Sequence, residues 1–397
     1  MSYTTTTESL ISFDNTEIAF AHKDDRSLKR AYRLFKMISQ PWLSSTGASL
    51  SQFALKAGLP VKGIIKNTLY AQFCGGESVE KSLPTINELA AANVLTVLDY
   101  GVEAKDSEAD FDRTLAEMEH EIQFAKDNDH VLCISCKLTG LARFALLEKL
   151  HAGKPLTPQE EAEWERTQER VNEISAFAHK HDVSLYIDAE ETWIQKPIDD
   201  IVTRMMEKYN QEKAIIFNTV QLYRHDRLSY LKDAFAEAEK GDYFYGIKLV
   251  RGAYMEKERE RARRLGYEDP INPTKVATDR DFNEAITFCI DHIDRISVCV
   301  ATHNEESNLL FARLIEERGI DKQHPHAFSC QLLGMSDHIT FNLANAGYRV
   351  GKYIPYGPVK DVVPYLSRRA KENTSVGGQM SRELQLLKRE MHRRNLI

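Results

Sequence analysis

Two tyrosines and two adjacent arginines near the C-terminus are the side chains of this sequence that most directly suggest chemistry. They lie in one segment, which contains Tyr353, Tyr365, Arg368, Arg369 and Glu372. The segment begins with the composition of a strand, turns at Gly357-Pro358 and continues as a predicted helix. Two guanidinium groups beside aromatic rings can hold a small carboxylate against an apolar ring. An Arg-Arg pair alone more often belongs to a solvated helix face. Whether this pair binds a ligand therefore depends on the rest of the chain.

Spacing within the predicted helix favours a binding face. Tyr365 precedes the two arginines by three and four residues, and Glu372 follows them by four and three, so these side chains lie along neighbouring lines of one face. Adjacent residues diverge by about 100° around a helix, so Arg368 and Arg369 cannot point the same way. One arginine can therefore bind a substrate carboxylate while the other reaches a cofactor.

Eight short apolar runs predict the elements that position this segment. They are rich in β-branched and aromatic residues and cover residues 94–100, 131–137, 184–188, 215–222, 244–250, 298–302, 327–332 and 348–354. Stretches with helical periodicity separate most of them, which implies parallel strands with right-handed crossovers. Eight such units over about 300 residues predict a (β/α)8 barrel of the TIM type. An open doubly wound sheet is the alternative, although no G-x-G-x-x-G follows any of these strands.

The chain divides by composition into two parts. Residues 1–90 predict a helical N-terminal extension, and residues 91–397 predict the barrel together with the final helix. In a barrel of this type the catalytic side chains gather at the C-terminal ends of the strands. Polar groups do follow nearly every predicted strand, namely Asp99, Lys137, Asp188, Glu190, Gln221, Lys248, Arg251, Tyr254, Thr302, His303, Asn304, Gln331 and Tyr353. Positive charge comes to this face from Lys137, Lys248, Arg251, Arg368 and Arg369, with His303, and Asp188 and Glu372 are counter-charges. Such a group of cations suits an anionic substrate or a phosphate-bearing cofactor.

Composition limits the classes of protein. The formal net charge is −7 without a basic tract, which disfavours nucleic acid as a partner, and no apolar run is long enough for a membrane-spanning helix. The N-terminus has the features of neither a secretory signal nor a mitochondrial transit peptide, so we expect a cytoplasmic protein. Six cysteines in so long a chain indicate buried reduced thiols. Cys133 and Cys136 form a C-x-x-C, but a strand would send them to opposite faces, and no metal site is predicted.

Five ordered motifs carry a resemblance to a known family. They are IDAEE at 187–191, KLVRGAY at 248–254, ATHN at 301–304, QLLGM at 331–335, and Y-x-P-x-G followed by Y-x-x-R-R-x-x-E-N at 353–373. In these motifs the chain resembles proline dehydrogenase from about residue 94 to residue 373. The resemblance implies a distorted (β/α)8 barrel that uses FAD to oxidise L-proline to Δ1-pyrroline-5-carboxylate.

The resemblance also implies roles for individual residues. A substrate-binding set would hold the proline carboxylate and ring: Lys137, Leu332, Tyr353, Tyr365, Arg368 and Arg369. A cofactor-binding set would hold FAD: Gln221, Lys248, Arg251, Gly252, Thr302, His303, Asn304, Arg369 and Glu372. The residues closest to the chemistry would be Lys137, Asp188, Lys248 and Tyr254, with Asp188 holding the cationic cluster in place through ion pairing. Lysine at 248 and arginine at 251 resemble the monofunctional branch, and Tyr353 favours proline over hydroxyproline.

The implied reaction is hydride transfer from proline C5 to flavin N5, with electrons passed to a quinone. A quinone acceptor implies peripheral contact with a membrane, the inner membrane in particular, and a chain of 397 residues leaves the product to a separate pyrroline-5-carboxylate dehydrogenase. The group that accepts the substrate amine proton is not identified by sequence or resemblance. Two other functions stay open: a Schiff-base enzyme with Lys137 or Lys248 as nucleophile, and a binding protein or regulator on the same fold.

Overall fold

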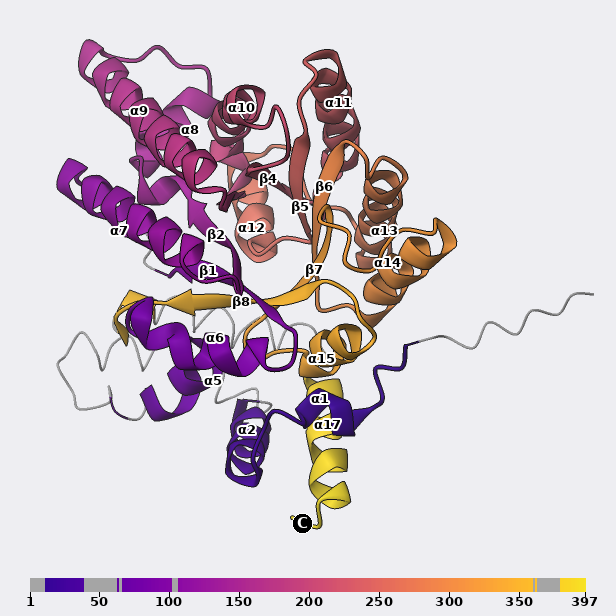
Figure 1. Ribbon diagram of the computed structural model, residues 1–397. Coiled ribbons are helices and arrows are strands. Elements are labelled where there is room, and N and C mark those ends of the chain that lie inside the picture. Colours follow the sequence, from indigo (N-terminus) through magenta and orange to yellow (C-terminus); the bar gives the residue numbers. More distant parts are fainter. Residues whose placement is uncertain (1–10, 39–62, 64–65, 102–105, 360, 363–378) are drawn as a thin grey trace, which may run out of the picture.

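Eight parallel strands close into a barrel in the order of the sequence, β1 pairing with β8 (Figure 1). The computed structural model describes residues 11–38, 63, 66–101, 106–359, 361–362 and 379–397. The strands are β1 (Leu95–Tyr100), β2 (Val131–Lys137), β3 (Ser184–Asp188), β4 (Ile216–Gln221), β5 (Tyr245–Val250), β6 (Ile296–Ala301), β7 (Ala327–Leu332) and β8 (Val350–Tyr356). The predicted barrel is therefore confirmed, and the open doubly wound sheet is wrong.

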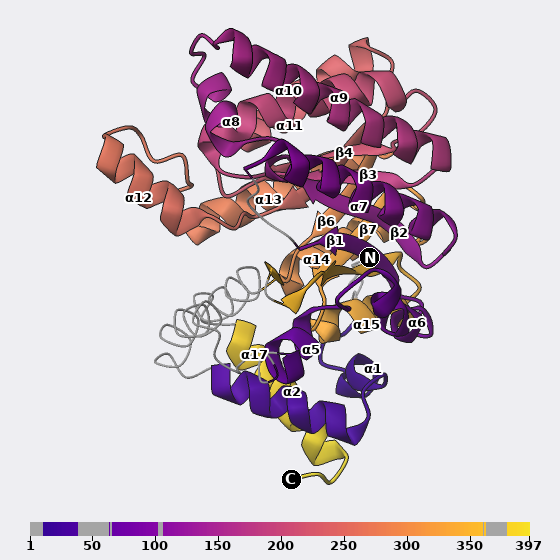
Figure 2. The ribbon, with the colours of Figure 1, turned by 90° about the vertical axis from the view of Figure 1, so that its left-hand side faces the viewer.

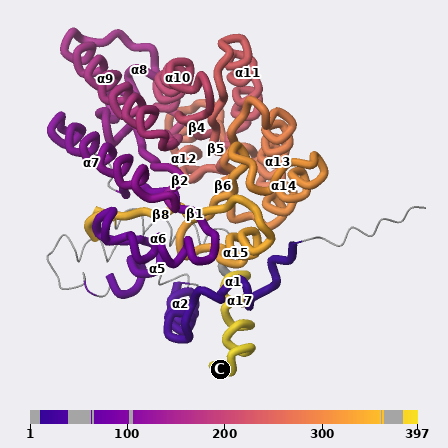
Figure 3. Tube along the Cα trace, viewed as in Figure 1, coloured from indigo at the N-terminus to yellow at the C-terminus, as the bar shows by residue number. Residues whose placement is uncertain are grey.

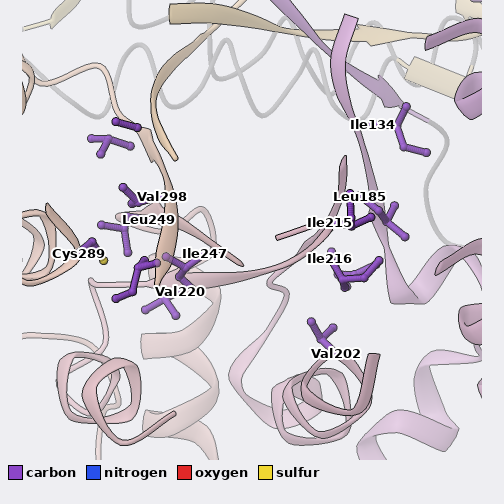
Figure 4. Close-up of a cluster of buried hydrophobic side chains, with 14 of the residues drawn as sticks. Ile134, Leu185, Val202, Ile215, Ile216, Val220, Ile247, Leu249, Cys289 and Val298 are labelled. Atoms are coloured by element: carbon purple, nitrogen blue, oxygen red, sulfur yellow. The ribbon is translucent and has the colours of Figure 1, made fainter. Parts of the chain in front are cut away.

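Alternation along each strand separates two apolar layers. Val97 and Cys133 face the inside of the barrel, whereas their neighbours Leu98 and Ile134 pack outward against the helices. Figure 4 shows part of the outer layer, where Val202 of a surrounding helix approaches Ile216 of β4. The same alternation confirms that Cys133 and Cys136 lie on opposite faces of β2. All six cysteines are free and buried.

Helices cover the outside of the barrel. Those that follow the strands in order are α7 (Glu108–Lys126), α9 (Pro158–His181), α10 (Thr192–Tyr209), α11 (Arg227–Lys240), α13 (Lys275–Asp291), α14 (Glu305–Glu317) and α15 (Asp337–Asn345). Two shorter helices, α8 (Phe144–His151) and α12 (Met255–Leu265), are inserted into this pattern. The helix α12 projects away from the barrel (Figure 2). The apolar faces of these helices pack on the sheet.

A second apolar core lies beside the barrel and joins the two ends of the described chain. The N-terminal elements are α1 (Thr16–Phe20), α2 (Asp25–Ile38), η1 (Lys66–Tyr70), α5 (Ala71–Phe73), η2 (Glu80–Ser82) and α6 (Leu83–Ala90). Helices α1 and α2 pack against α17 (Gln379–Arg393), as Figures 1 and 3 show. Phe20, Leu28, Phe73 and Leu387 are buried together there. The division of the chain at residue 90 stays a prediction, and this core contains side chains from both of its parts.

Candidate active site

A carboxylate at the C-terminal end of the barrel gathers side chains from four strands. Asp188 of β3 forms an ion pair with Lys248 of β5. Ser135 Oγ of β2 donates a hydrogen bond to Asp188 Oδ1 at 2.8 Å, and the Tyr353 hydroxyl of β8 donates to Oδ2 at 3.0 Å. The Tyr353 hydroxyl also lies 2.9 Å from Ser135 Oγ. This polar cluster sits where the strand ends meet, as a barrel enzyme requires.

Strand pairing explains why these side chains converge. Lys137 stands opposite Asp188 in the register of β2 and β3, and Ser135 lies on the same face of β2 as Lys137. On β5, Lys248 pairs in register with Cys299, which lines the inside of the barrel. Tyr353 on β8 also packs against this inner layer. These side chains meet inside the barrel because each one occupies an inward-facing position of its strand.

The ion pair is buried and charged. Lys248 is 4% exposed, and burial alone lowers its pKa, but the charge and hydrogen bond of Asp188, with smaller contributions from Cys299 and Asp99, together outweigh burial and raise the pKa above its usual value. Burial likewise acts to raise the pKa of Asp188, and the ammonium groups of Lys248 and Lys137 bring the pKa below its usual value. The Lys248 ammonium also lies 5.6 Å from the centre of the Tyr186 ring and 5.1 Å from that of Tyr353. These ring faces stabilise a cation.

Two more carboxyl groups border this cluster. Burial raises the pKa of Glu190 to about 7, although its carboxyl accepts hydrogen bonds from the backbone and side chain of Thr139 at 3.0 and 2.6 Å. Burial also raises the pKa of Asp99 at the end of β1, with the Lys137 charge acting in the opposite direction. Both residues are among the polar strand ends that the sequence predicts.

A second polar group surrounds the guanidinium of Arg251, just beyond β5. Its Nε donates to Asp279 Oδ1 at 2.9 Å, Nη1 to Thr302 Oγ1 at 2.7 Å and Nη2 to Ser307 Oγ at 3.0 Å. Asn304 caps the N-terminus of α14 by accepting a hydrogen bond from the Ser307 amide at 2.8 Å. A guanidinium held at a helix N-terminus is suited to a phosphate group.

Gly252 follows Arg251 in a conformation that only glycine adopts readily. Its φ is +139°, and a Cβ atom there would lie 2.5 Å from the ring of Tyr223. Gly252 is exposed to solvent. Because Gly252 has no side chain, a bound group can approach the backbone closely at this point.

The remaining predicted residues lie around these two groups. Gln221 is buried at the end of β4 and donates to the Glu190 carbonyl at 2.7 Å. His303 Nδ1 lies 3.0 Å from Ser336 Oγ. Leu332 ends β7 and Tyr254 precedes α12, both half-buried. Tyr365, Arg368, Arg369 and Glu372 lie outside the described residues. The structure thus gathers the described members at one barrel end, and their individual roles stay predictions.

Sequence reasoning did not identify the residues that hold these groups in place. Ser135 binds both Asp188 and Tyr353, and its signal was its position two residues before Lys137 on an inward face. Asp279 and Ser307 orient Arg251 from α13 and α14, and nothing in a single sequence marks them. Among the described residues, no group of three or more His, Cys, Asp and Glu side chains is arranged to hold a metal ion. Within the described ranges, no helix is both long and apolar enough to cross a bilayer.

Comparison with known structures supports the fold. Proline utilization A (PutA) from Bdellovibrio bacteriovorus, in a structure inactivated by N-propargylglycine, matches with a TM-score of 0.68 at 21% sequence identity. The match covers 90% of this chain and 38% of the PutA chain. At this level of identity the likeness shows the fold alone.

Sequence comparison identifies the family. "Proline dehydrogenase 1, mitochondrial" of Drosophila melanogaster is 41% identical over 249 residues, which cover 60% of this chain and 37% of the fly protein. The human protein of the same name is 42% identical over 241 residues, which cover 60% of this chain and 40% of the relative. "Carbapenem antibiotics biosynthesis protein CarD" of Pectobacterium carotovorum subsp. carotovorum is 33% identical over 346 residues, 87% of this chain and 90% of CarD.

This chain therefore spans less than half of the fly and human relatives and nearly all of CarD. The fly and human names say mitochondrial, which differs from the cytoplasmic location expected from the N-terminal sequence. The family model described as proline dehydrogenase matches residues 82–382, which include every strand of the barrel. The chain belongs to the proline dehydrogenase family.

Proposed function

We propose that this protein uses FAD to oxidise L-proline to Δ1-pyrroline-5-carboxylate, the first step of proline catabolism. The observation that carries the proposal is the buried Lys248–Asp188 pair with Tyr353 at the same barrel end as the Arg251 group. One group supplies a fixed cation beside an aromatic wall, and the other suits a phosphate. Membership of the family agrees with both.

The residues present fit FAD. The Arg251 guanidinium at the α14 N-terminus matches a pyrophosphate, and the exposed Gly252 backbone leaves room for a large neighbour. The side chains that would hold the cofactor are Gln221, Lys248, Arg251, Gly252, Thr302, His303 and Asn304, with Arg369 and Glu372 from the segment outside the described residues. When bound, FAD supplies the hydride acceptor at flavin N5.

The chain's own residues would bind and orient the substrate. Lys137, Arg368 and Arg369 supply positive charge for the proline carboxylate. Tyr353, Tyr254, Tyr365 and Leu332 supply apolar walls for the ring. Asp188 contacts both Lys248 and Tyr353 through its two oxygens, which orients these side chains before substrate binds. The buried Lys248 keeps its positive charge at neutral pH and stabilises negative charge that develops nearby.

The finer parts of the function are proposals that follow from the family. Hydride leaves proline C5, electrons pass on to a quinone, and a separate pyrroline-5-carboxylate dehydrogenase takes the product. A quinone acceptor requires peripheral contact with a membrane, which we keep as the proposal for location in place of a purely cytoplasmic one. A Schiff-base role for Lys248 is disfavoured, because the raised pKa keeps its amine protonated and non-nucleophilic.

Anaerobic mixing of the FAD-loaded protein with L-proline tests this function. We expect loss of the oxidised-flavin absorbance, and we expect Arg368→Ala and Arg369→Ala each to weaken proline binding by about 1.5–3 kcal/mol. The control is Arg318→Ala, which removes an arginine that pairs with Asp291 at the C-terminal ends of α14 and α13, the end of the barrel opposite to the site. The proposal would be contradicted by a protein that binds no FAD, or by a bound flavin that L-proline does not reduce.

A further inference from the structure

The serine that begins α15 does not play the usual part of a residue in that position. Ser336 is the N-cap of α15, where a serine hydroxyl normally accepts a hydrogen bond from a backbone N–H of the first turn, but it forms no such bond. Its backbone has φ 51° and ψ 42°, a left-handed conformation that residues other than glycine seldom adopt. Departures of this kind from local preference are typical of functional sites.

The Ser336 hydroxyl contacts an imidazole of the proposed cofactor site instead. Ser336 Oγ lies 3.0 Å from Nδ1 of His303, which follows β6 in the ATHN motif. The neighbour of His303, Asn304, does cap its own helix, because its side chain accepts a hydrogen bond from the Ser307 amide. The loops after β6 and β7 therefore use their cap residues differently, and the Ser336 hydroxyl serves the site in place of the helix.

The left-handed backbone of Ser336 is held by the C-terminal helix α17. Glu383 of α17, which is 6% exposed, accepts a hydrogen bond from the Ser336 N–H to its Oε2 at 2.9 Å. The preceding residue, Arg382, binds the Glu305 carboxylate through Nε at 2.8 Å and Nη2 at 3.3 Å. Glu305 begins α14 and lies two residues after His303. Two consecutive residues of α17 therefore fix both loops that meet where Ser336 contacts His303.

The donors and acceptors at this contact determine which imidazole nitrogen carries the proton. A neutral imidazole has one N–H donor and one bare nitrogen that accepts. Ser336 is 3% exposed, and among the described residues its hydroxyl has no acceptor other than His303. A buried hydroxyl hydrogen without an acceptor costs free energy, whereas donation to a bare Nδ1 satisfies both groups. Ser336 therefore donates, Nδ1 of His303 accepts, and Nε2 carries the proton.

We propose that Ser336 is a positioning residue that keeps the proton of His303 on Nε2, so that this nitrogen donates a hydrogen bond to an acceptor atom of bound FAD. The pyrophosphate and the ring systems of FAD both offer such atoms. An imidazole that is already fixed as a donor loses little further freedom when the cofactor binds, which favours affinity. This inference rests on the proposed function, since it concerns the same cofactor. It assigns Ser336 to the site although Ser336 acts only through His303.

Ser336→Gly provides the main test, because glycine removes the hydroxyl and suits the left-handed backbone. We expect the flavin-free variant to melt at the temperature of the wild type or above it, since no cap is lost and backbone strain is relieved. We expect its dissociation constant for FAD, measured by titration of the full chain, to rise about tenfold, the effect of one hydrogen bond. An unchanged dissociation constant, or a lower melting temperature, would overturn the inference.

Ser107→Ala is the matched control, because Ser107 is an N-cap serine that does cap its helix. Its Oγ accepts a hydrogen bond from the Asp110 N–H at the start of α7 at 3.2 Å, and it belongs to neither the proposed substrate-binding nor the proposed cofactor-binding set. Loss of this cap should lower the melting temperature and leave the FAD dissociation constant unchanged. The two serine variants thus have opposite expected results. Equal weakening of FAD binding in both would count against a specific role for Ser336.

Nitrogen NMR of the full chain before FAD is added reads the protonation of His303 directly. In protein labelled with 15N-histidine, the wild type should show a bare Nδ1 and a protonated Nε2 for this residue, and His303→Gln identifies the two signals by their loss. In Ser336→Gly the two signals should move toward each other as the proton exchanges between the nitrogens. A proton on Nδ1 in the wild type would contradict the inference. Failure of the proposed function is a separate result, because then the wild type itself would not bind FAD.

Discussion

Two buried lysine–aspartate pairs lie in neighbouring parts of this molecule and are built differently. Lys248 pairs with Asp188 inside the barrel, and Lys352 of β8 pairs with Asp337 of α15 outside it, at 2.9 Å. Both lysines are almost completely buried. Burying charge costs free energy in either place unless partners compensate it.

The number of hydrogen-bond acceptors distinguishes the two. Lys352 Nζ lies 2.9 Å from Asp337 Oδ1, 2.5 Å from the Met335 carbonyl and 3.4 Å from that of Leu332, which matches its three donors. Among the described residues, Lys248 has one acceptor, Asp188 Oδ1, and otherwise faces aromatic rings. A saturated lysine holds structure together, and one with donors to spare is available to a ligand. We therefore interpret Lys352 as a structural charge and Lys248 as a functional one.

Removing the saturated lysine should have the largest effect. Lys352→Met leaves Asp337 buried without this partner, so we expect the free energy of unfolding to fall by about 3–5 kcal/mol. Denaturant titration measures it, and the double variant Lys352→Met/Asp337→Asn should recover part of the loss. A loss below about 1 kcal/mol would show that Lys23, 3.1 Å from Asp337, compensates by itself.

Lys248→Met should instead affect the reaction. We expect the rate of flavin reduction by proline to fall about 100- to 1000-fold, which corresponds to about 2.7–4 kcal/mol of transition-state stabilisation. Asp188 keeps its hydrogen bonds from Ser135 and Tyr353, so the unfolding free energy should change less than in Lys352→Met. Rapid-mixing absorbance measures the rate of flavin reduction, and denaturant titration of the same samples measures the unfolding free energy. The reverse ranking would refute the distinction.

The smallest of the three predicted effects concerns Glu190 and the dependence of stability on pH. The pKa of Glu190 is about 7 in the folded protein, above its usual 4.5, so the folded state binds the proton more tightly than the unfolded state. Stability is then greatest below about pH 4.5 and is lost as the pH rises toward 7, by roughly 2–3 kcal/mol. Glu190→Gln should flatten this part of the stability profile. Parallel profiles for the two proteins would show that Glu190 does not titrate there.

The barrel could be predicted because each strand carries its own signal. Residues 131–137 and 327–332 alternate inward and outward side chains with turn residues at both ends, and the observed strands have those same bounds. Parallel strands in chain order then bring the polar ends together by topology. For this reason Lys137, Asp188, Lys248 and Tyr353 could be placed at one mouth before any contact was known.

Other features depend on contacts between distant residues and leave no local signal. The pairing of Arg251 with Ser307 joins residues that are 56 apart in the chain. The packing of α2 against α17 follows from complementary apolar faces that each look like an ordinary amphipathic helix. Orphaned carboxyl oxygens, as in Glu121, become visible only when burial is known. The sequence therefore predicted well where polar side chains lie in the barrel, and poorly which residues they bind.

The joint core of α1, α2 and α17 has a consequence for synthesis of the chain. Phe20 and Leu28 bury their side chains against Leu386 and Leu387, which leave the ribosome more than 300 residues later. Until then, the N-terminal helices expose apolar surface while the barrel strands form. Contacts of such long range slow folding, and a nascent chain with uncovered apolar faces is a natural client for chaperones. We therefore expect the first helices to dock last.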